Sequence, residues 1–253
     1  MNLFFNLHIA NKYNSTSQKI RVMSEDWTLN NAYCPNCGSI IEKFPNNHYC
    51  GDFYCANCYE EFELKTKKDN FGSLIVDGAY KVLYDKLRRK KVPNFFLLNY
   101  NTDDYFVTNF LVIPKHFFTY EVIQKRKPLS CNARRANWIG SNILINHIPN
   151  SGKIYYVKNK KEFDKDIVLE KWGKTLFLIE QDKLKGWTLD VMRCLDEIDK
   201  EEFDIDDVYK FEKYLQQKHP NNKHIKDKIR QQLQYLRDKG YIEFIQKGKY
   251  RKK

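Results

Sequence analysis

Two Cys-x-x-Cys pairs lie close together in the first part of the chain, at Cys34/Cys37 and Cys55/Cys58. Zinc prefers four soft ligands at the corners of a tetrahedron, and two such pairs with 17 residues between them have the spacing of a zinc ribbon. A redox function needs only one pair, so the pattern favours zinc. All four positions of this site would be filled by protein, which is typical of a structural zinc ion.

A second set of chemically active side chains surrounds the second cysteine pair. Asp52 precedes this pair, and Glu63 and Lys65 follow it. A strand through these residues places Glu63 and Lys65 on one face, and Asp52 can lie on the neighbouring strand of the same hairpin. The two carboxylates and the Leu64 carbonyl could bind Mg²⁺. The Lys65 ammonium group could orient the attacking water in phosphodiester hydrolysis and offset charge on the phosphate. The alternative is an ordinary surface ion pair, in a chain with 30% charged residues.

The segments around these residues predict a mixed α+β domain. Residues 16–29 and 77–91 have apolar side chains at helical spacing, with Asp77 as the N-cap of the second helix. Residues 162–172 also fit a helix. Between and after these segments, the sequence predicts strands at residues 95–100, 105–113, 143–148, 154–157 and 175–179.

The pattern changes near residues 180–186, and we place a domain boundary there, between domains 1–182 and 183–253. Three helices and then a basic hairpin follow. They are predicted at residues 187–196, 205–217, 223–239 and 241–245, with the hairpin turning at residues 247–249. Three helices followed by a β-wing are the plan of a winged helix, which is a variant of the helix-turn-helix.

The distribution of charge suggests a polyanionic partner. The chain of 253 residues has a formal net charge of +12. Residues 222–253 carry 11 Lys and Arg against 3 Asp and Glu, so most of the excess lies in the predicted winged helix. A basic domain of this kind favours nucleic acid or an anionic membrane surface, although a solvated lysine-rich surface is the simpler alternative.

The third predicted helix of this domain has two distinct faces. Its apolar stripe consists of Ile225, Ile229, Leu233 and Leu236. The opposite face is a candidate DNA contact and carries Lys223, Lys226, Asp227, Arg230 and Gln234. On the wing, we expect phosphate contacts from Lys249, Arg251 and Lys252.

The composition also restricts the cellular setting. The sequence has no apolar run approaching the ~18 residues of a membrane-spanning helix, and its start lacks the basic head of a signal peptide. We therefore expect a cytoplasmic protein without membrane contact, whose seven cysteines are reduced. No heptad pattern stands out, so we expect a monomer.

The order of residues 52–65, Asp-Phe-Tyr-Cys-x-x-Cys-x-Glu-Glu-Phe-Glu-Leu-Lys, resembles the catalytic hairpin of DpnI-type restriction endonucleases, which belong to the PD-(D/E)xK nucleases. The likeness spans nearly the whole chain. It continues at residues 77–80, 93–96, 133–140, 224–233 and 248–252. One departure is Gly51, where the name of the superfamily has proline.

The resemblance implies an α+β fold, in which a PD-(D/E)xK nuclease core of a mixed sheet and flanking helices carries a zinc ribbon and precedes a small winged helix. It implies a type II restriction endonuclease that cleaves double-stranded DNA at GATC only when the adenine carries an N6-methyl group. Hydrolysis would depend on Mg²⁺ and leave a 5′-phosphate, with Asp52, Glu63 and Lys65 as the catalytic residues. The winged helix would itself recognise the methylated site.

Methyl recognition places a further demand on the protein. Burying one methyl group contributes only about 0.8 kcal/mol, so strong discrimination needs more than one apolar pocket. In the larger domain, Arg134, Arg135 and Trp138 form a basic and aromatic loop, and Trp138 could contact the methyl-bearing edge of the base.

Two other functions stay open at this point. A zinc ribbon joined to a winged helix also suits a DNA-binding regulator without catalysis, although a regulator has no need of Asp52, Glu63 and Lys65. The chain could also be a nuclease that is specific for another modified base.

Overall fold

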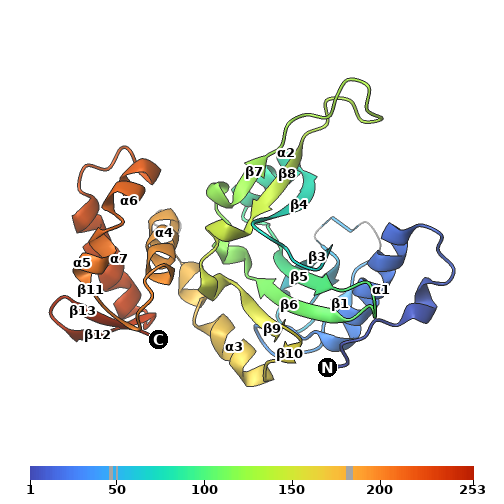
Figure 1. Cartoon of the computed structure of the whole chain (residues 1–253), viewed down its shortest axis with the longest axis horizontal. Coiled ribbons are helices and arrows are strands. Elements are labelled where there is room, and N and C mark those ends of the chain that lie inside the picture. Colours follow the sequence, from blue (N-terminus) through green and yellow to red (C-terminus); the bar gives the residue numbers. More distant parts are fainter. Residues whose placement is uncertain (46–47, 50, 181–184) are drawn as a thin grey trace. The chain divides into compact units, whose positions relative to one another are not determined.

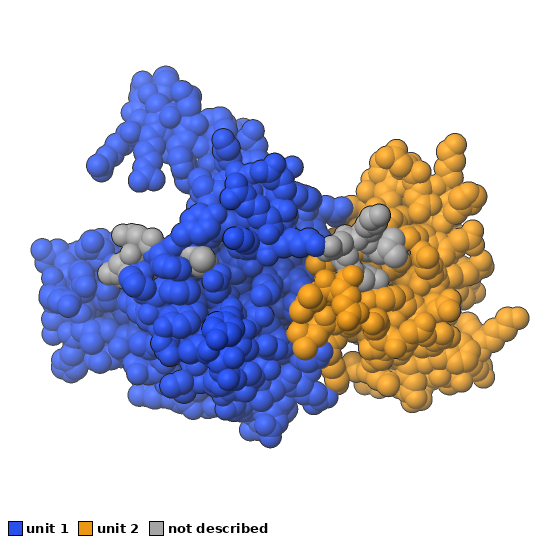
Figure 2. All heavy atoms as spheres, turned by 180° about the vertical axis from the view of Figure 1, so that it is seen from behind, with its two compact units in different colours: residues 1–147, 151–173 blue, residues 148–150, 174–253 orange. Residues whose placement is uncertain are grey.

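The computed structural model describes residues 1–45, 48–49, 51–180 and 185–253. Contacts between these residues divide the chain into two compact units, residues 1–147 with 151–173 and residues 148–150 with 174–253 (Figure 2). The predicted boundary between residues 182 and 183 lies outside the described residues. Along the described residues, no helix has both the length and the apolar character needed to cross a bilayer.

A mixed seven-stranded sheet, in the order β1-β2-β3-β5-β6-β9-β10, forms the body of the first unit. Its strands are β1 (Glu42–Lys43), β2 (Phe53–Tyr54), β3 (Glu61–Lys68), β5 (Asn94–Tyr100), β6 (Val107–Ile113), β9 (Ile154–Lys158) and β10 (Lys161–Glu162). Only β3 and β5 are parallel among these neighbours. A parallel pair needs a crossover connection, and the chain between them supplies β4 (Leu74–Ala79) and α2 (Tyr80–Arg88).

A large hydrophobic cluster of this unit covers one face of the large sheet, and the opposite face of β5 is buried as well. Helices α1 (Thr16–Asn31) and α3 (Lys165–Gly173) contribute Trp27 and Trp172 to the same buried cluster as Phe62 and Phe96 of the sheet. The rings of Phe62 and Phe96 stack with their centroids 4.5 Å apart. Because side chains alternate along a strand, a buried Phe62 directs Glu63 to the opposite face of β3.

A second, antiparallel sheet in the first unit has the order β4-β8-β7, with β8 at Gly140–Leu144 and β7 at Ile123–Lys125. Residues 126–139, between β7 and β8, form a long loop that projects away from both strands (Figure 1). Short 3-10 helices connect the remaining elements. They are η1 (Leu7–Ala10), η2 (Lys115–Phe117), η3 (Tyr120–Val122), η4 (Ile145–His147) and η5 (Asn150–Gly152).

The second unit has helices packed against a small sheet with the order β11-β13-β12. Its elements are η6 (Leu176–Leu178), α4 (Lys185–Asp196), β11 (Glu202–Asp204), α5 (Ile205–Tyr209), α6 (Glu212–Lys218), α7 (Ile225–Asp238), β12 (Ile242–Gln246) and β13 (Lys249–Lys252). The apolar stripe predicted for α7 is buried. Asp204 and Asp207 form a reciprocal capping box at the start of α5.

Four predictions about elements were wrong in part or in whole. Asp77 does not cap a helix, because it lies in β4 and α2 begins only at Tyr80. Residues 175–179 contain η6 rather than a strand, since a short apolar run has no periodicity that separates strand from helix. The helix predicted at 205–217 is divided into α5 and α6, and the strand predicted at 143–148 ends at Leu144.

Candidate active site and metal centre

The four cysteines of the two pairs form one cluster. The sulfur atoms of Cys34, Cys37, Cys55 and Cys58 all lie within 4.8 Å of one another. The Sγ atoms of Cys34 and Cys58 are 3.4 Å apart, and those of Cys37 and Cys55 are 3.5 Å apart. Zinc with Zn–S bonds of about 2.3 Å separates its tetrahedral sulfur ligands by roughly 3.8 Å. The cluster therefore has the size and the donor chemistry of a zinc site.

The two cysteine turns have the same backbone pattern. In the first, the Cys34 amide donates to the Ser39 carbonyl, and the Gly38 amide donates to the Cys34 carbonyl. The second turn has the same two bonds: the Cys55 amide donates to the Glu60 carbonyl, and the Tyr59 amide donates to the Cys55 carbonyl. The residue after the second cysteine has a positive φ in both turns, 76° at Gly38 and 61° at Tyr59. Two equivalent turns facing one another are the arrangement predicted for a zinc ribbon.

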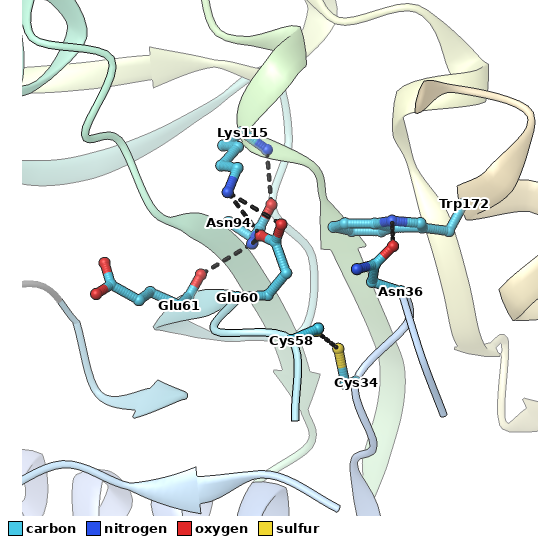
Figure 3. A network of polar contacts seen from close by, with 8 residues as sticks. All are labelled: Cys34, Asn36, Cys58, Glu60, Glu61, Asn94, Lys115 and Trp172. Carbon is cyan, nitrogen blue, oxygen red and sulfur yellow. Dashed lines mark hydrogen bonds and ion pairs between the residues drawn. The ribbon is translucent and has the colours of Figure 1, made fainter. Parts of the chain in front are cut away.

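Side chains from the rest of the unit hold both turns in place. The Trp172 indole donates to Asn36 in the first turn over 3.1 Å. Beside the second turn, the buried Asn94 amide donates to the Glu60 carboxylate, which also pairs with Lys115 (Figure 3). Lys115 returns a backbone hydrogen bond to the Asn94 side chain. The cysteine cluster is thus connected to α3 and to the start of β5.

The hairpin that ends in the second cysteine turn places Asp52 directly beside β3. The Asp52 amide donates to the Phe62 carbonyl over 2.8 Å, and the Leu64 amide donates to Asp52 Oδ2 over 2.7 Å. Gly51 permits this close approach, because a Cβ atom there would lie 2.6 Å from the Phe62 carbonyl oxygen. The departure from proline at this position therefore has a steric reason, and Asp52 is held against the segment that carries Glu63.

Lys65 lies among acidic side chains on the same strand face. Its ammonium group is 2.6 Å from Glu63 Oε1 and also pairs with Asp77 of β4. Lys86 of α2 approaches the other oxygen of Glu63, at 4.0 Å. The Lys65 ammonium group also lies 5.9 Å from the centroid of the buried Phe95 ring. Glu63 and Lys65 are therefore adjacent, as the alternation of the strand predicted.

The pKa shifts of Asp52 and Lys65 reflect burial together with the charges of neighbouring side chains. Burial raises the pKa of Asp52, and the neighbouring carboxylate of Glu63 raises it further, against the opposing hydrogen bond from the Leu64 amide. Burial by itself would lower the pKa of Lys65, but Glu63 and Asp77 outweigh it and raise the pKa above its ordinary value. Asp52 beside β3 and Glu63 on β3 offer carboxylate oxygens, which are the donors that a divalent cation such as Mg²⁺ prefers.

Sequence reasoning missed Asp77 and Lys86. The interpretation of Asp77 as a helix cap hid its proximity to Lys65, which arises from the pairing of β4 with β8. Lys86 lies on the predicted helix, yet its side chain is only 10% exposed and approaches Glu63. The one available signal was the likeness to the family at residues 77–80, which includes Asp77.

Trp138 lines a surface pocket of about 390 Å³, whose wall also includes Tyr80, Tyr84 and Lys125. The tryptophan ring lies against Gly140, where a Cβ atom would be 2.9 Å from it. Arg134 and Arg135, predicted to belong to the same site, are exposed in the loop and do not line this pocket. Trp138 is thus half-buried in an aromatic pocket, separate from the two arginines.

All five residues of the predicted DNA face are exposed, but Lys223 lies before α7 and not on it, since the helix begins only at Ile225; the other four are Lys226, Asp227, Arg230 and Gln234. Two of its cations already have acidic partners, because Arg230 pairs with Asp227 at 3.0 Å and Lys226 with Glu212 at 3.6 Å. On the wing, Lys249 is exposed. Arg251 pairs with Glu202 and Glu243, and Lys252 donates to the Ile198 carbonyl. Arg251 thus joins β11 and β12 across β13, and Lys252 joins β13 to the segment before β11.

Comparison with known families gives two matches that together span nearly the whole chain. Residues 1–181 match the DpnI, or Dam-replacing, family, and residues 183–252 match the Dam-replacing HTH domain. The first match covers well over half of the chain and agrees with the predicted resemblance. Membership implies methyl-directed restriction activity and a DNA-binding helix-turn-helix domain. The chain therefore belongs to the DpnI, or Dam-replacing, family and has that family's C-terminal HTH domain.

Proposed function

We propose that this protein is a type II restriction endonuclease of the PD-(D/E)xK superfamily that cleaves double-stranded DNA at GATC sites bearing N6-methyladenine. Mg²⁺-dependent hydrolysis would leave a 5′-phosphate. The observation that carries this proposal is the convergence of Asp52, Glu63 and Lys65 at one hairpin. A DNA-binding regulator has no use for such a site, whereas a nuclease requires one.

Asp52 and Glu63 are the carboxylates that would hold Mg²⁺, together with the backbone carbonyl of Leu64. When bound, the ion supplies a Lewis acid that lowers the pKa of water and offsets charge on the phosphate. The Lys65 ammonium group, directly beside Glu63, orients the attacking water and stabilises the negative charge that develops on the phosphate oxygens. Asp52 is already fixed for this task by its hydrogen bond from the Leu64 amide.

The cysteine cluster would hold a structural zinc ion. The four cysteine sulfurs would supply all the ligands of a tetrahedral zinc ion, which would leave no place for substrate. Its second turn joins β2 to β3, so the ion fixes the hairpin that carries Asp52 and Glu63. Zinc would thereby support the catalytic geometry without taking part in the chemistry.

The aromatic pocket around Trp138 is suited to the methyl group of the base. A methyl on adenine N6 projects into the major groove and requires an apolar wall there. Tyr80, Tyr84 and Trp138 supply such a wall, and Lys125 supplies a cation beside it. In the second unit, the exposed face of α7 would enter the groove of the same sequence, with Lys223, Lys226 and Arg230 near phosphates.

The first experiment is the digestion of plasmids with and without adenine methylation at GATC, in the presence of Mg²⁺. We expect cleavage of methylated plasmid only, with ends that ligate because they carry 5′-phosphates. Lys65→Ala should lower the cleavage rate by roughly 10²–10³-fold, because charge on the phosphate is left unstabilised, and should retain methyl-specific binding. Binding by the wild type without any cleavage would support the regulator. Cleavage that follows another modification would support a different specificity.

Cys55→Ser should lose zinc and weaken the hairpin that positions Asp52. We expect the zinc content, measured by atomic absorption, to fall from about one ion per chain to none. The melting temperature should fall by about 5 °C or more, since each kcal/mol lost shifts it by about 2–4 °C in a chain of this size. Cys131→Ser is the control, because Cys131 is exposed and lies outside the cluster. Full zinc content and an unchanged melting temperature in Cys55→Ser would refute the zinc proposal.

Trp138→Ala should reduce the preference for methylated over unmethylated DNA. A methyl contact of about 0.8 kcal/mol corresponds to roughly a fourfold loss of preference for each methyl group that the pocket reads. Competition binding with the two duplexes in Ca²⁺ measures this ratio. Leu129→Ala is the matched control, since Leu129 is exposed and belongs to the same loop but not to the pocket. An unchanged ratio in Trp138→Ala would place the methyl contact elsewhere.

The double variant Lys226→Gln/Arg230→Gln should weaken binding and flatten its salt dependence. Each phosphate contact contributes about 0.9 to the slope of log K against log salt concentration, so the loss of two contacts should change the slope by about 1.8. Lys239→Gln, just after the opposite end of α7, is the control and should leave the slope unchanged. A double variant with the wild-type slope would show that this face of α7 does not contact DNA.

A further inference from the structure

Lys65 has two anionic partners that come from different sheets. Glu63 lies two residues away on β3 of the large sheet, and Asp77 lies on β4 of the small sheet. Only 18% of the Lys65 side chain and 7% of the Asp77 side chain are exposed. The ion pair between them is therefore largely shielded from water, which strengthens it relative to a surface pair.

The two partners differ in what else they must do. In the proposed nuclease, Glu63 is a Mg²⁺ ligand, and its Oε1 atom is the atom that Lys65 contacts in this structure. A carboxylate bound to a divalent cation has less negative charge to offer a neighbouring ammonium group. Asp77 has no such second task in the proposed mechanism, so it is the partner that stays with Lys65 when the ion binds.

The backbone around Asp77 is well fixed. β4 pairs with β8, where Asp77 lies opposite Ser141, and the pairing is irregular between Asp77 and Ala79. The hydroxyl of the fully buried Ser141 donates to the Gly78 carbonyl over 3.0 Å. This bond holds the irregular segment directly after Asp77. The backbone of Asp77 is consequently held by the small sheet and not by the hairpin that carries Asp52 and Glu63.

We propose that Asp77 is a positioning residue for the catalytic lysine, and that it holds the Lys65 ammonium group in place while Glu63 binds Mg²⁺. This inference rests on the proposed nuclease function. It also assigns a role to the small sheet, because β4 brings a fixed anion to the catalytic face of the large one. Asp77 touches neither the ion nor the DNA in this role and acts only through Lys65.

The test uses the full-length protein and a short duplex with a methylated GATC site, under single-turnover conditions with enzyme in excess. Asp77→Asn keeps the shape of the side chain and removes its charge. We expect its maximum cleavage rate to fall about 100-fold, the loss that misplacement of a catalytic group by about 1 Å can cause. The enzyme concentration and the Mg²⁺ concentration at half-maximal rate should both stay at the wild-type values.

Two further variants complete the experiment. Asp77→Glu retains the carboxylate and should cleave at a rate between those of the wild type and Asp77→Asn. Asp85→Asn, on α2, is the control and should cleave at the wild-type rate, because the Asp85 carboxylate pairs with Arg88 of the same helix, whereas Lys65 pairs with Glu63 and Asp77. Binding of the same duplex in Ca²⁺ shows that each variant is folded. If Asp77→Asn does not fold, Asp77→Glu carries the test.

Three results would overturn the inference. The first is a wild-type maximum rate in Asp77→Asn, or in Asp77→Glu if that variant carries the test. The second is a variant whose cleavage rate returns to the wild-type value at a higher Mg²⁺ concentration, which would make Asp77 a metal ligand. The third is a loss that lies entirely in DNA affinity. Failure of the wild type to cleave methylated DNA at all would instead refute the proposed function itself.

Discussion

The structure of the candidate site depends on one constraint, which is that a largely buried acid, Asp52, is held against the strand that carries Glu63 and Lys65. Asp52 is fixed to β3 at two points, through its amide to Phe62 and through its carboxylate to Leu64. Glu63 lies between these two residues on the strand. Asp52 cannot move away from β3 without breaking these two hydrogen bonds, so its carboxylate stays beside the strand, where a bound cation would offset the cost of burying its charge.

The features around this hairpin can be understood as its support. Gly51 allows the backbone to approach β3 more closely than any residue with a Cβ atom could. The cysteine cluster closes the far end of the hairpin, and the buried Asn94 joins Glu60 to the start of β5. Beneath the strand, Phe62 is fully buried against Phe96.

Local pattern was sufficient to predict the parts of the site that lie close together in sequence. The spacing of the cysteines predicted their cluster, and strand alternation predicted that Glu63 and Lys65 share a face. Helical periodicity likewise predicted the buried stripe and the exposed face of α7. Asp77 and Lys86 were missed because their proximity to Lys65 and Glu63 depends on a second sheet and a crossover helix, which no local pattern shows. For the same reason, the acidic partners of Arg251 were not foreseen.

The most direct test of this account is a crystal structure of the protein with Ca²⁺ and a duplex that contains methylated GATC, in which Ca²⁺ takes the place of Mg²⁺ without supporting cleavage. The account predicts an ion about 2.4 Å from oxygen atoms of Asp52, Glu63 and the Leu64 carbonyl, and in contact with a phosphate of the DNA. The account would be contradicted by an ion bound elsewhere, or by Asp52 and Glu63 carboxylates that point in different directions and share no ion.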